Sequence, residues 1–156
     1  MLPIEASKLL IVDGIEDDPL TKARADRMRA GIIADEVIHV DDAALSRIIE
    51  DEVRGNPRNG MRSDDKAVVI FNRFRLDDTE AEQQRRNEQY PALDSLKYNG
   101  YGGFDWRDSG SETHRLKTGG VCQPAWQIHT ITGCHFRCSY CGLSRCLNIM
   151  MNMEDY

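Results

Sequence analysis

Three short apolar runs, each followed at once by glycine, aspartate or asparagine, predict three strands in the first half of the chain. The runs lie within residues 8–13, 37–40 and 67–71. Each is shorter than a typical buried helix and shows little polar alternation, which is typical of a strand that is covered on both faces of a parallel sheet. We therefore expect three strands, the first of them buried, joined by polar segments that are long enough to hold helices.

The polar segment between the first two runs has the pattern of a helix. Pro19 can open this helix and Gly31 stands near its expected end, because proline suits the first helical position and glycine suits the C-terminal cap. Leu20, Ala23 and Met28 form the apolar stripe that we expect to face the sheet.

A second helix is expected between the second and third runs. Asp41 or Asp42 is a natural N-cap, because a short side-chain oxygen there can accept a hydrogen bond from the first helical turn. The expected apolar face consists of Leu45, Ile48, Ile49 and Val53. Strands that alternate with helices predict an α/β fold class, in which residues 8–72 form a βαβαβ layer with parallel strand pairing.

The second half of the chain is less regular. Residues 77–125 are polar and rich in glycine, which predicts a connector that contributes little to the core. Alternation from Ala125 to Ile131 predicts a strand that leads into Gly133, and Leu147–Met153 fits either a strand or the start of a helix. The expected domain organisation is an N-terminal α/β domain at 1–76, the connector at 77–125 and a third region at 126–156.

Charge and hydropathy exclude some classes of function. The formal charge of −6 comes from residues 1–65, which hold nine Lys/Arg and fifteen Asp/Glu, whereas residues 66–156 hold eleven of each. A nucleic-acid surface needs clustered positive charge, so the composition does not support one. The chain also lacks an apolar run of the roughly 20 residues that span a bilayer and lacks a secretion signal. We expect a cytoplasmic protein without membrane contact.

Three of the five cysteines lie close together, at Cys134, Cys138 and Cys141. Such clustering fits metal ligation in a reducing compartment better than a secreted disulfide framework. The spacing C-x3-C-x2-C lets one loop place three thiolates around a cubic iron–sulfur cluster. Three ligands leave one iron open to a cofactor or substrate, whereas four cysteines saturate the cluster of a ferredoxin.

The residues by themselves are also compatible with two other kinds of metal site. A structural zinc site could take Cys146 or His135 as a fourth ligand, although zinc knuckles usually show paired ligand motifs. An electron-transfer cluster could take Cys146 as its fourth thiolate. A single cysteine more often behaves as a small buried apolar residue, so we assign no role to Cys122 or Cys146.

The cysteine spacing, with Tyr140 directly before the last cysteine, resembles the radical S-adenosylmethionine superfamily. The resemblance implies that Cys134, Cys138 and Cys141 ligate a [4Fe–4S] cluster, that the open iron binds S-adenosylmethionine and that Tyr140 packs near its adenine. It also implies that the reduced cluster cleaves this cofactor to a 5′-deoxyadenosyl radical, which abstracts a hydrogen atom from the substrate. An electron donor such as flavodoxin or ferredoxin is an implied partner.

Three further segments resemble spore photoproduct lyase and its relatives, a family of radical enzymes that repair DNA. They are Thr132-Gly133-Cys134, Tyr140-Cys141-Gly142-Leu143 and Asn148–Glu154. The resemblance implies a lyase that repairs a thymine photoproduct by hydrogen abstraction and return, with DNA as a partner. The lyase has a tyrosine at the position of Gly142, so a related enzyme with another substrate fits the sequence equally well.

The resemblance also implies how the fold should continue. Members of the superfamily build a partial (β/α) barrel after the cluster loop, whereas about fifteen residues follow Cys141 here. We therefore expect the βαβαβ layer to be followed by the first element of a truncated radical S-adenosylmethionine barrel. On this interpretation the chain is the N-terminal part of a longer enzyme and is catalytically inactive alone.

Overall fold

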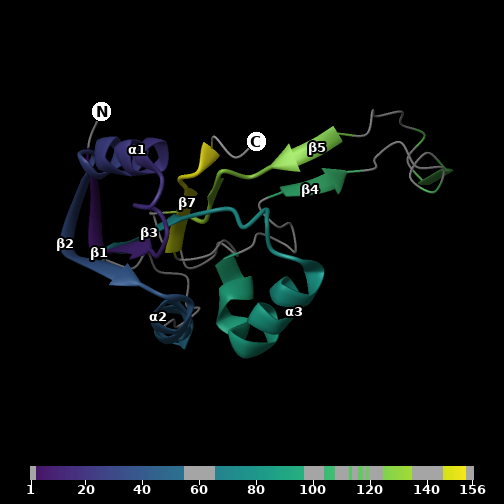
Figure 1. Cartoon of the computed structure of the whole chain (residues 1–156), viewed down its shortest axis with the longest axis horizontal. Helices are drawn as coiled ribbons and strands as arrows, with labels where there is room; N and C mark the ends of the chain where they lie inside the picture. The colour runs from purple at the N-terminus through teal and green to yellow at the C-terminus, as the bar shows by residue number, and fades with distance from the viewer. Residues whose placement is uncertain are drawn as a thin grey trace.

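A five-stranded mixed sheet with helices on both faces forms the body of the protein (Figure 1). The computed structural model describes residues 3–54, 66–96, 104–107, 113, 116–117, 119, 125–134 and 146–153. The strand order is β2-β1-β3-β7-β6. The strands of this sheet are β1 (Ile4–Val12), β2 (Ile32–Val40), β3 (Ala67–Asn72), β6 (Ile131–Thr132) and β7 (Cys146–Met150). The predicted α/β fold class is confirmed.

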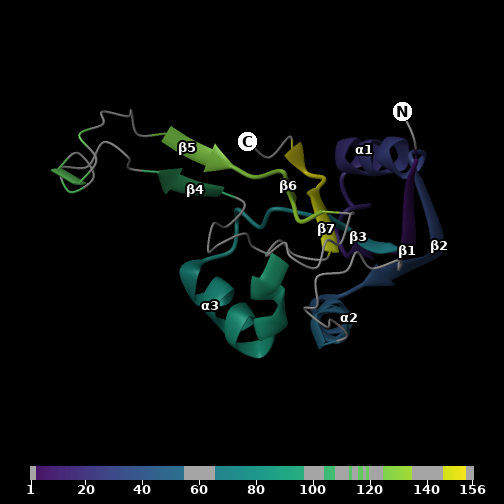
Figure 2. The ribbon, with the colours of Figure 1, turned by 180° about the vertical axis from the view of Figure 1, so that it is seen from behind.

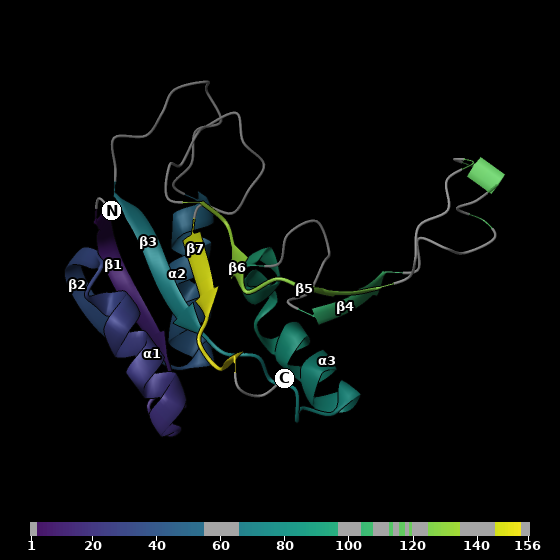
Figure 3. The ribbon, with the colours of Figure 1, turned by 90° about the horizontal axis from the view of Figure 1, so that it is seen from above.

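The first three strands form the predicted parallel βαβαβ layer. β1 pairs with β2 and with β3 in parallel register, and all six residues of β3 are buried. Helices α1 (Pro19–Arg29) and α2 (Asp42–Arg54) cover opposite faces of the sheet (Figures 1 and 3). The chain moves along the sheet in one direction from β1 to β2 and in the other direction from β2 past β1 to β3. Two right-handed crossovers in opposite directions place their helices on opposite faces.

Helix α1 begins at Pro19 as predicted, but it faces the sheet with different residues. The Asp18 carboxylate accepts a hydrogen bond of 2.6 Å from the Thr21 backbone N–H. Thr21 and Ala25 are the buried residues, whereas Leu20 is 60% exposed. Met28 continues the face of Thr21 and Ala25 at helical spacing and packs against the core. The predicted stripe of Leu20, Ala23 and Met28 is therefore correct only for Met28, because small residues let the helix lie close to the sheet.

Helix α2 agrees closely with its prediction. Asp41 is the N-cap, since its Oδ1 accepts a 2.7 Å hydrogen bond from the Ala44 backbone N–H. Leu45 and Ile49 are buried and Ile48 is partly buried, as the apolar spacing predicts. The side chain of Val53 lies outside the described residues.

Part of the predicted connector belongs to the core. Helix α3 (Glu80–Gln89) buries no residue and begins with a capping box between Thr79 and Glu82. The 3-10 helix η1 (Pro91–Leu96) follows, and its Leu93 and Leu96 are buried in the main hydrophobic core. The prediction that this region contributes little core is therefore wrong, because two leucines in a single short turn produce no periodic signal. Among the described residues, no helix has the length and apolar character to cross a membrane.

The later strands have two different arrangements. β4 (Phe104–Arg107) and β5 (Ala125–Ile128) form a separate antiparallel pair that extends away from the sheet (Figures 1 and 3). β7 is a strand that pairs in parallel with β3, and β6 pairs with β7 in antiparallel fashion (Figure 2). The region around the cysteines is thus bounded by strands of the same sheet as the N-terminal layer. The division into domains and the barrel stay predictions.

A buried asparagine joins the segments that follow β3 and β7. Asn152 Oδ1 accepts a hydrogen bond of 2.7 Å from the Phe74 backbone N–H, and Asn152 Nδ2 donates one of 2.9 Å to the Phe74 carbonyl. Asn152 is 6% exposed and Phe74 is 7% exposed, so water cannot readily replace either bond. The side chain therefore continues the strand pairing beyond the end of the sheet.

We expect Asn152→Ala to lower the free energy of unfolding by about 2 kcal/mol, because it leaves two buried backbone groups without these partners. Urea denaturation measures this change. Asn87→Ala, at an exposed position of α3, is the control. It should not lower the free energy of unfolding, since alanine is the better helix former. Equal changes in the free energy of unfolding for the two substitutions would contradict the stabilising role of the Asn152 hydrogen bonds.

Gly14 occupies a backbone conformation that other residues rarely adopt, with φ at 89°. We expect Gly14→Ala to destabilise the fold by about 1–2 kcal/mol, because an L side chain is strained there. Gly31→Ala is the control, since Gly31 lacks a positive φ and an added Cβ would lie 3.5 Å from the Met28 carbonyl oxygen, an ordinary contact. Thermal and urea unfolding should rank Gly31→Ala well above Gly14→Ala in stability.

Candidate functional site

The predicted cluster loop connects two neighbouring strands of the sheet. β6 ends at Thr132, and Cys134 follows as a half-buried residue after Gly133, whose φ is 82°. Thr132 is paired with Asn148 of β7, so the two ends of the loop are held side by side. Cys138, Cys141 and Tyr140 lie outside the described residues.

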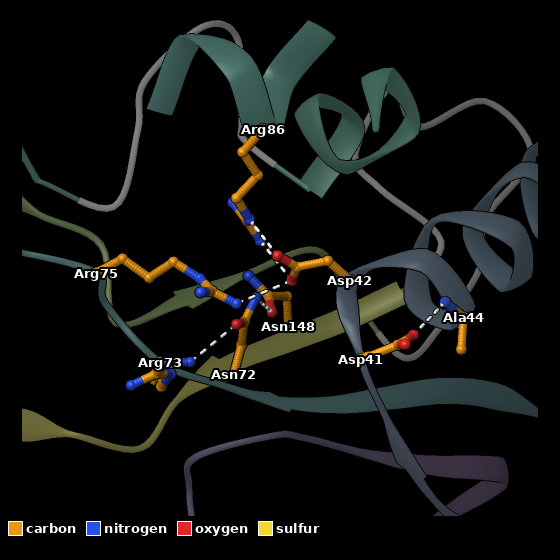
Figure 4. A network of polar contacts seen from close by, with 8 residues as sticks. All are labelled: Asp41, Asp42, Ala44, Asn72, Arg73, Arg75, Arg86 and Asn148. Carbon is orange, nitrogen blue, oxygen red and sulfur yellow. Dashed lines mark hydrogen bonds and ion pairs between the residues drawn. The ribbon is translucent and has the colours of Figure 1, made fainter. Parts of the chain in front are cut away.

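A chain of buried hydrogen bonds fixes the ends of this loop. Asn72 Nδ2 donates to Asn148 Oδ1 at 3.0 Å, and Asn148 Nδ2 donates to Thr132 Oγ1 at 3.3 Å (Figure 4 shows the two asparagines). The Thr132 hydroxyl in turn donates to the Leu96 carbonyl at 2.8 Å. Asn72, Thr132 and Asn148 are each at most 7% exposed. A satisfied buried network of this kind holds β3, β7, β6 and η1 in one arrangement.

The metal ligand set itself stays a prediction. Within the described ranges, no three His, Cys, Asp or Glu residues are grouped so that they could hold a metal ion. Two of the three predicted thiolates fall outside those ranges, so this observation does not bear on the cluster. Cys146 is 2% exposed and belongs to the hydrophobic core, which agrees with a small apolar role. Cys122 and His135 lie outside the described residues.

A cavity of about 470 Å³ lies at the carboxyl ends of β3 and β7. This is the edge at which α/β folds usually bind ligands. Most of the lining residues have polar side chains. They include Asn72, Arg73, Arg75, Asp78, Gln83, Arg86, Asn87, Thr132 and Asn148. No motif in the sequence predicted this cavity.

Two arginines beside the cavity converge on one carboxylate. Arg86 of α3 donates to Asp42 from Nε at 2.7 Å and from Nη2 at 3.1 Å, and Arg75 donates from Nη2 at 2.9 Å (Figure 4). The Asp42 side chain is 17% exposed. Asp42 is the first residue of α2, where a negative charge also interacts well with the helix dipole. The three groups therefore fasten α3 and the segment after β3 to the start of α2.

The charges of this cluster shift its titration. Burial raises the pKa of Asp42, but the hydrogen bond from Arg86 and the charges of Arg86, Arg75 and Arg73 outweigh burial, so the pKa lies below its ordinary value. Burial lowers the pKa of Arg75, and the neighbouring Arg86 charge acts in the same direction. Asp42 is thus a carboxylate at neutral pH, surrounded by more than one positive charge.

The comparisons with known proteins gave no match. No protein-family model matches the sequence, and neither a curated protein nor a solved structure resembles the chain significantly.

We expect Asp42→Asn to lower the free energy of unfolding by roughly 2 kcal/mol near neutral pH, because Arg75 and Arg86 lose their charged partner. The folded-state pKa of Asp42 is depressed, so its contribution is present above the unfolded value of about 3.9 and is lost as the pH falls through the folded value. Urea denaturation from neutral to acidic pH should therefore show the gap between wild type and variant closing below about pH 4.

The matched control is Asp26→Asn, which removes the carboxylate of an exposed i,i+4 pair with Lys22. An exposed pair contributes little, so this substitution should leave unfolding nearly unchanged. A gap for Asp42→Asn that is the same at every pH would contradict the role of the ion pairs.

Proposed function

We propose that the chain is part of a radical S-adenosylmethionine enzyme that resembles spore photoproduct lyase. The observation that carries the proposal is the C-x3-C-x2-C spacing of Cys134, Cys138 and Cys141, with Tyr140 before the last cysteine. The three thiolates would ligate a [4Fe–4S] cluster. When bound, the cluster and S-adenosylmethionine supply a 5′-deoxyadenosyl radical for hydrogen abstraction.

The described ends of the loop fit this role. Gly133 supplies the left-handed turn that leads into the first predicted ligand, and Cys134 is half-buried at that point. The pairing of Thr132 with Asn148 holds the two ends of the loop together. These residues hold the first thiolate near the start of β7, and a loop anchored at both ends gives its ligands few alternative positions.

The substrate class follows from the resemblance and rests on it. We extend the proposal to a lyase-type reaction on a DNA photoproduct. Because the lyase has a tyrosine at the position of Gly142, a different substrate that undergoes the same hydrogen abstraction fits the sequence equally well. The strands around the cysteines would then be the first element of a partial (β/α) barrel. Tyr140 would lie beside the adenine of S-adenosylmethionine.

Anaerobic reconstitution with iron and sulfide, followed by electron paramagnetic resonance of the reduced protein, tests the proposal. We expect a [4Fe–4S] signal that changes when S-adenosylmethionine is added, because the open iron binds the cofactor. Cys138→Ala should abolish this signal. Cys146→Ala is the matched control and should retain it, since Cys146 lies in the core.

Three outcomes would contradict the proposal. Loss of the cluster in Cys146→Ala, with a signal that S-adenosylmethionine leaves unchanged, would indicate a four-thiolate electron-transfer site. Stoichiometric zinc without iron would indicate a structural metal module. Absence of any cluster, both in this chain and in a form extended beyond Tyr156, would also exclude the radical chemistry.

A further inference from the structure

Positive side chains gather at the carboxyl edge of the sheet, although the whole chain has a formal charge of −6. Arg73, Arg75 and Arg86 line the cavity of about 470 Å³, and Asp78 is the one carboxylate among the described residues of its lining. Asp42 neutralises one further charge through its ion pairs with Arg75 and Arg86. The cavity wall therefore keeps an excess of positive charge.

Arg73 differs from the other two arginines because it has no ion-pair partner among the residues that the structure describes. Its guanidinium lies against Gly14, with Cζ 2.9 Å from the position that a Cβ on this glycine would take. Gly14 follows β1 and Arg73 follows β3, the two strands from which the chain turns to opposite faces of the sheet. Ligands of α/β folds bind in the crevice at this switch point.

Two guanidinium nitrogens at the cavity lack an acceptor. The Nε atoms of Arg73 and Arg75 are buried and have no hydrogen-bond partner within the described part of the chain. Buried donors are almost always paired in folded proteins, so an unpaired one marks a position where another group completes the bonding. An anion in the cavity would supply the negative charge that these guanidinium groups lack.

We propose that this cavity binds the phosphate group of a small phosphorylated ligand through Arg73, Arg75 and Arg86. Arginine is the preferred residue for such groups because its planar guanidinium offers several donors in a fixed geometry. Two of the three guanidinium groups are already held by Asp42, so their positions are fixed before a ligand arrives. The volume is within the range of roughly 300–1,000 Å³ that is usual for small-molecule sites.

A phosphate group fits this arrangement better than a carboxylate does. The donors come from two chain segments, the residues after β3 and helix α3, and the Asn87 and Gln83 amides add further donors at the wall. The two oxygens of a carboxylate lie in one plane, whereas a phosphate group presents three strong acceptor oxygens arranged around a tetrahedral centre and can accept hydrogen bonds from several directions at once. Donors that come from two chain segments therefore favour phosphate.

The site is separate from the predicted cluster. β6 runs antiparallel to β7, so Cys134 lies toward the start of β7, whereas the cavity lies where β3 and β7 end. The phosphate proposal consequently does not rest on the radical chemistry. Cys138→Ala should leave phosphate binding unchanged, which distinguishes failure of one proposal from failure of the other.

Calorimetric titration of the whole chain with inorganic phosphate and with pyrophosphate tests the inference. We expect both to bind and Arg73→Gln to weaken binding by about tenfold or more, because a hydrogen bond to a charged group is lost. Arg47→Gln, which removes an exposed arginine of α2, is the charge-matched control and should bind as the wild type does. Arg73→Lys, which keeps the charge without the planar fork, should bind with intermediate affinity.

Four results would overturn the inference. They are absence of phosphate and pyrophosphate binding, equal weakening in Arg73→Gln and Arg47→Gln, tighter binding of acetate or malonate than of phosphate, and binding of a single-stranded oligonucleotide without binding of the small phosphates. Thermal unfolding of each variant confirms that it is folded. If Arg73→Gln does not fold, Arg73→Lys is compared with Arg47→Gln instead. Weaker phosphate binding in Arg73→Lys supports the inference, and equal binding in the two variants overturns it.

Discussion

The pairing of β3 with β7 is the constraint on which the rest of the structure depends. β3 belongs to the N-terminal layer and β7 follows the cysteines, so their parallel register joins the two halves of the chain. The side chains of Asn72 and Asn148 form a hydrogen bond across this pairing inside the core. A buried amide must find its partner, so the bond selects one register among the several that apolar strands would tolerate. The cavity and the ends of the cluster loop are both placed by this register.

Ion pairs with Asp42 determine where the arginines lie at the carboxyl edge of the sheet. Asp42 brings Arg75 and Arg86 to one point from positions 33 and 44 residues away. A single carboxylate cannot neutralise two guanidinium groups, and Arg73 adds a third charge nearby. The fold therefore concentrates cations at the carboxyl edge of the sheet. This local excess of positive charge contrasts with the formal charge of −6 of the whole chain.

β1 and β3 could be predicted because a buried parallel strand has a continuous apolar run of its own. β2 buries only Val40, and the sequence indicated it through the short apolar run at its end. The face of α1 could not be predicted, since Thr21 and Ala25 are too small and too polar to produce an amphipathic signal. The burial of Leu93 and Leu96 could not be predicted either, because one 3-10 turn is too short to show a hydrophobic period. The cysteine spacing is visible because its ligands are neighbours in sequence, whereas the arginine cavity is built entirely from long-range contacts.

The antiparallel arrangement of β6 and β7 has a consequence for how the predicted metal site would form. In a zinc finger the metal must bring distant ligands together, so the apoprotein is unfolded. Here the sheet already joins the ends of the cysteine segment, and the loop-closure entropy is offset by strand pairing and by the buried Thr132–Asn148 contact. The apoprotein should consequently keep its sheet, and a bound metal would add stability by mass action without being needed to nucleate the fold.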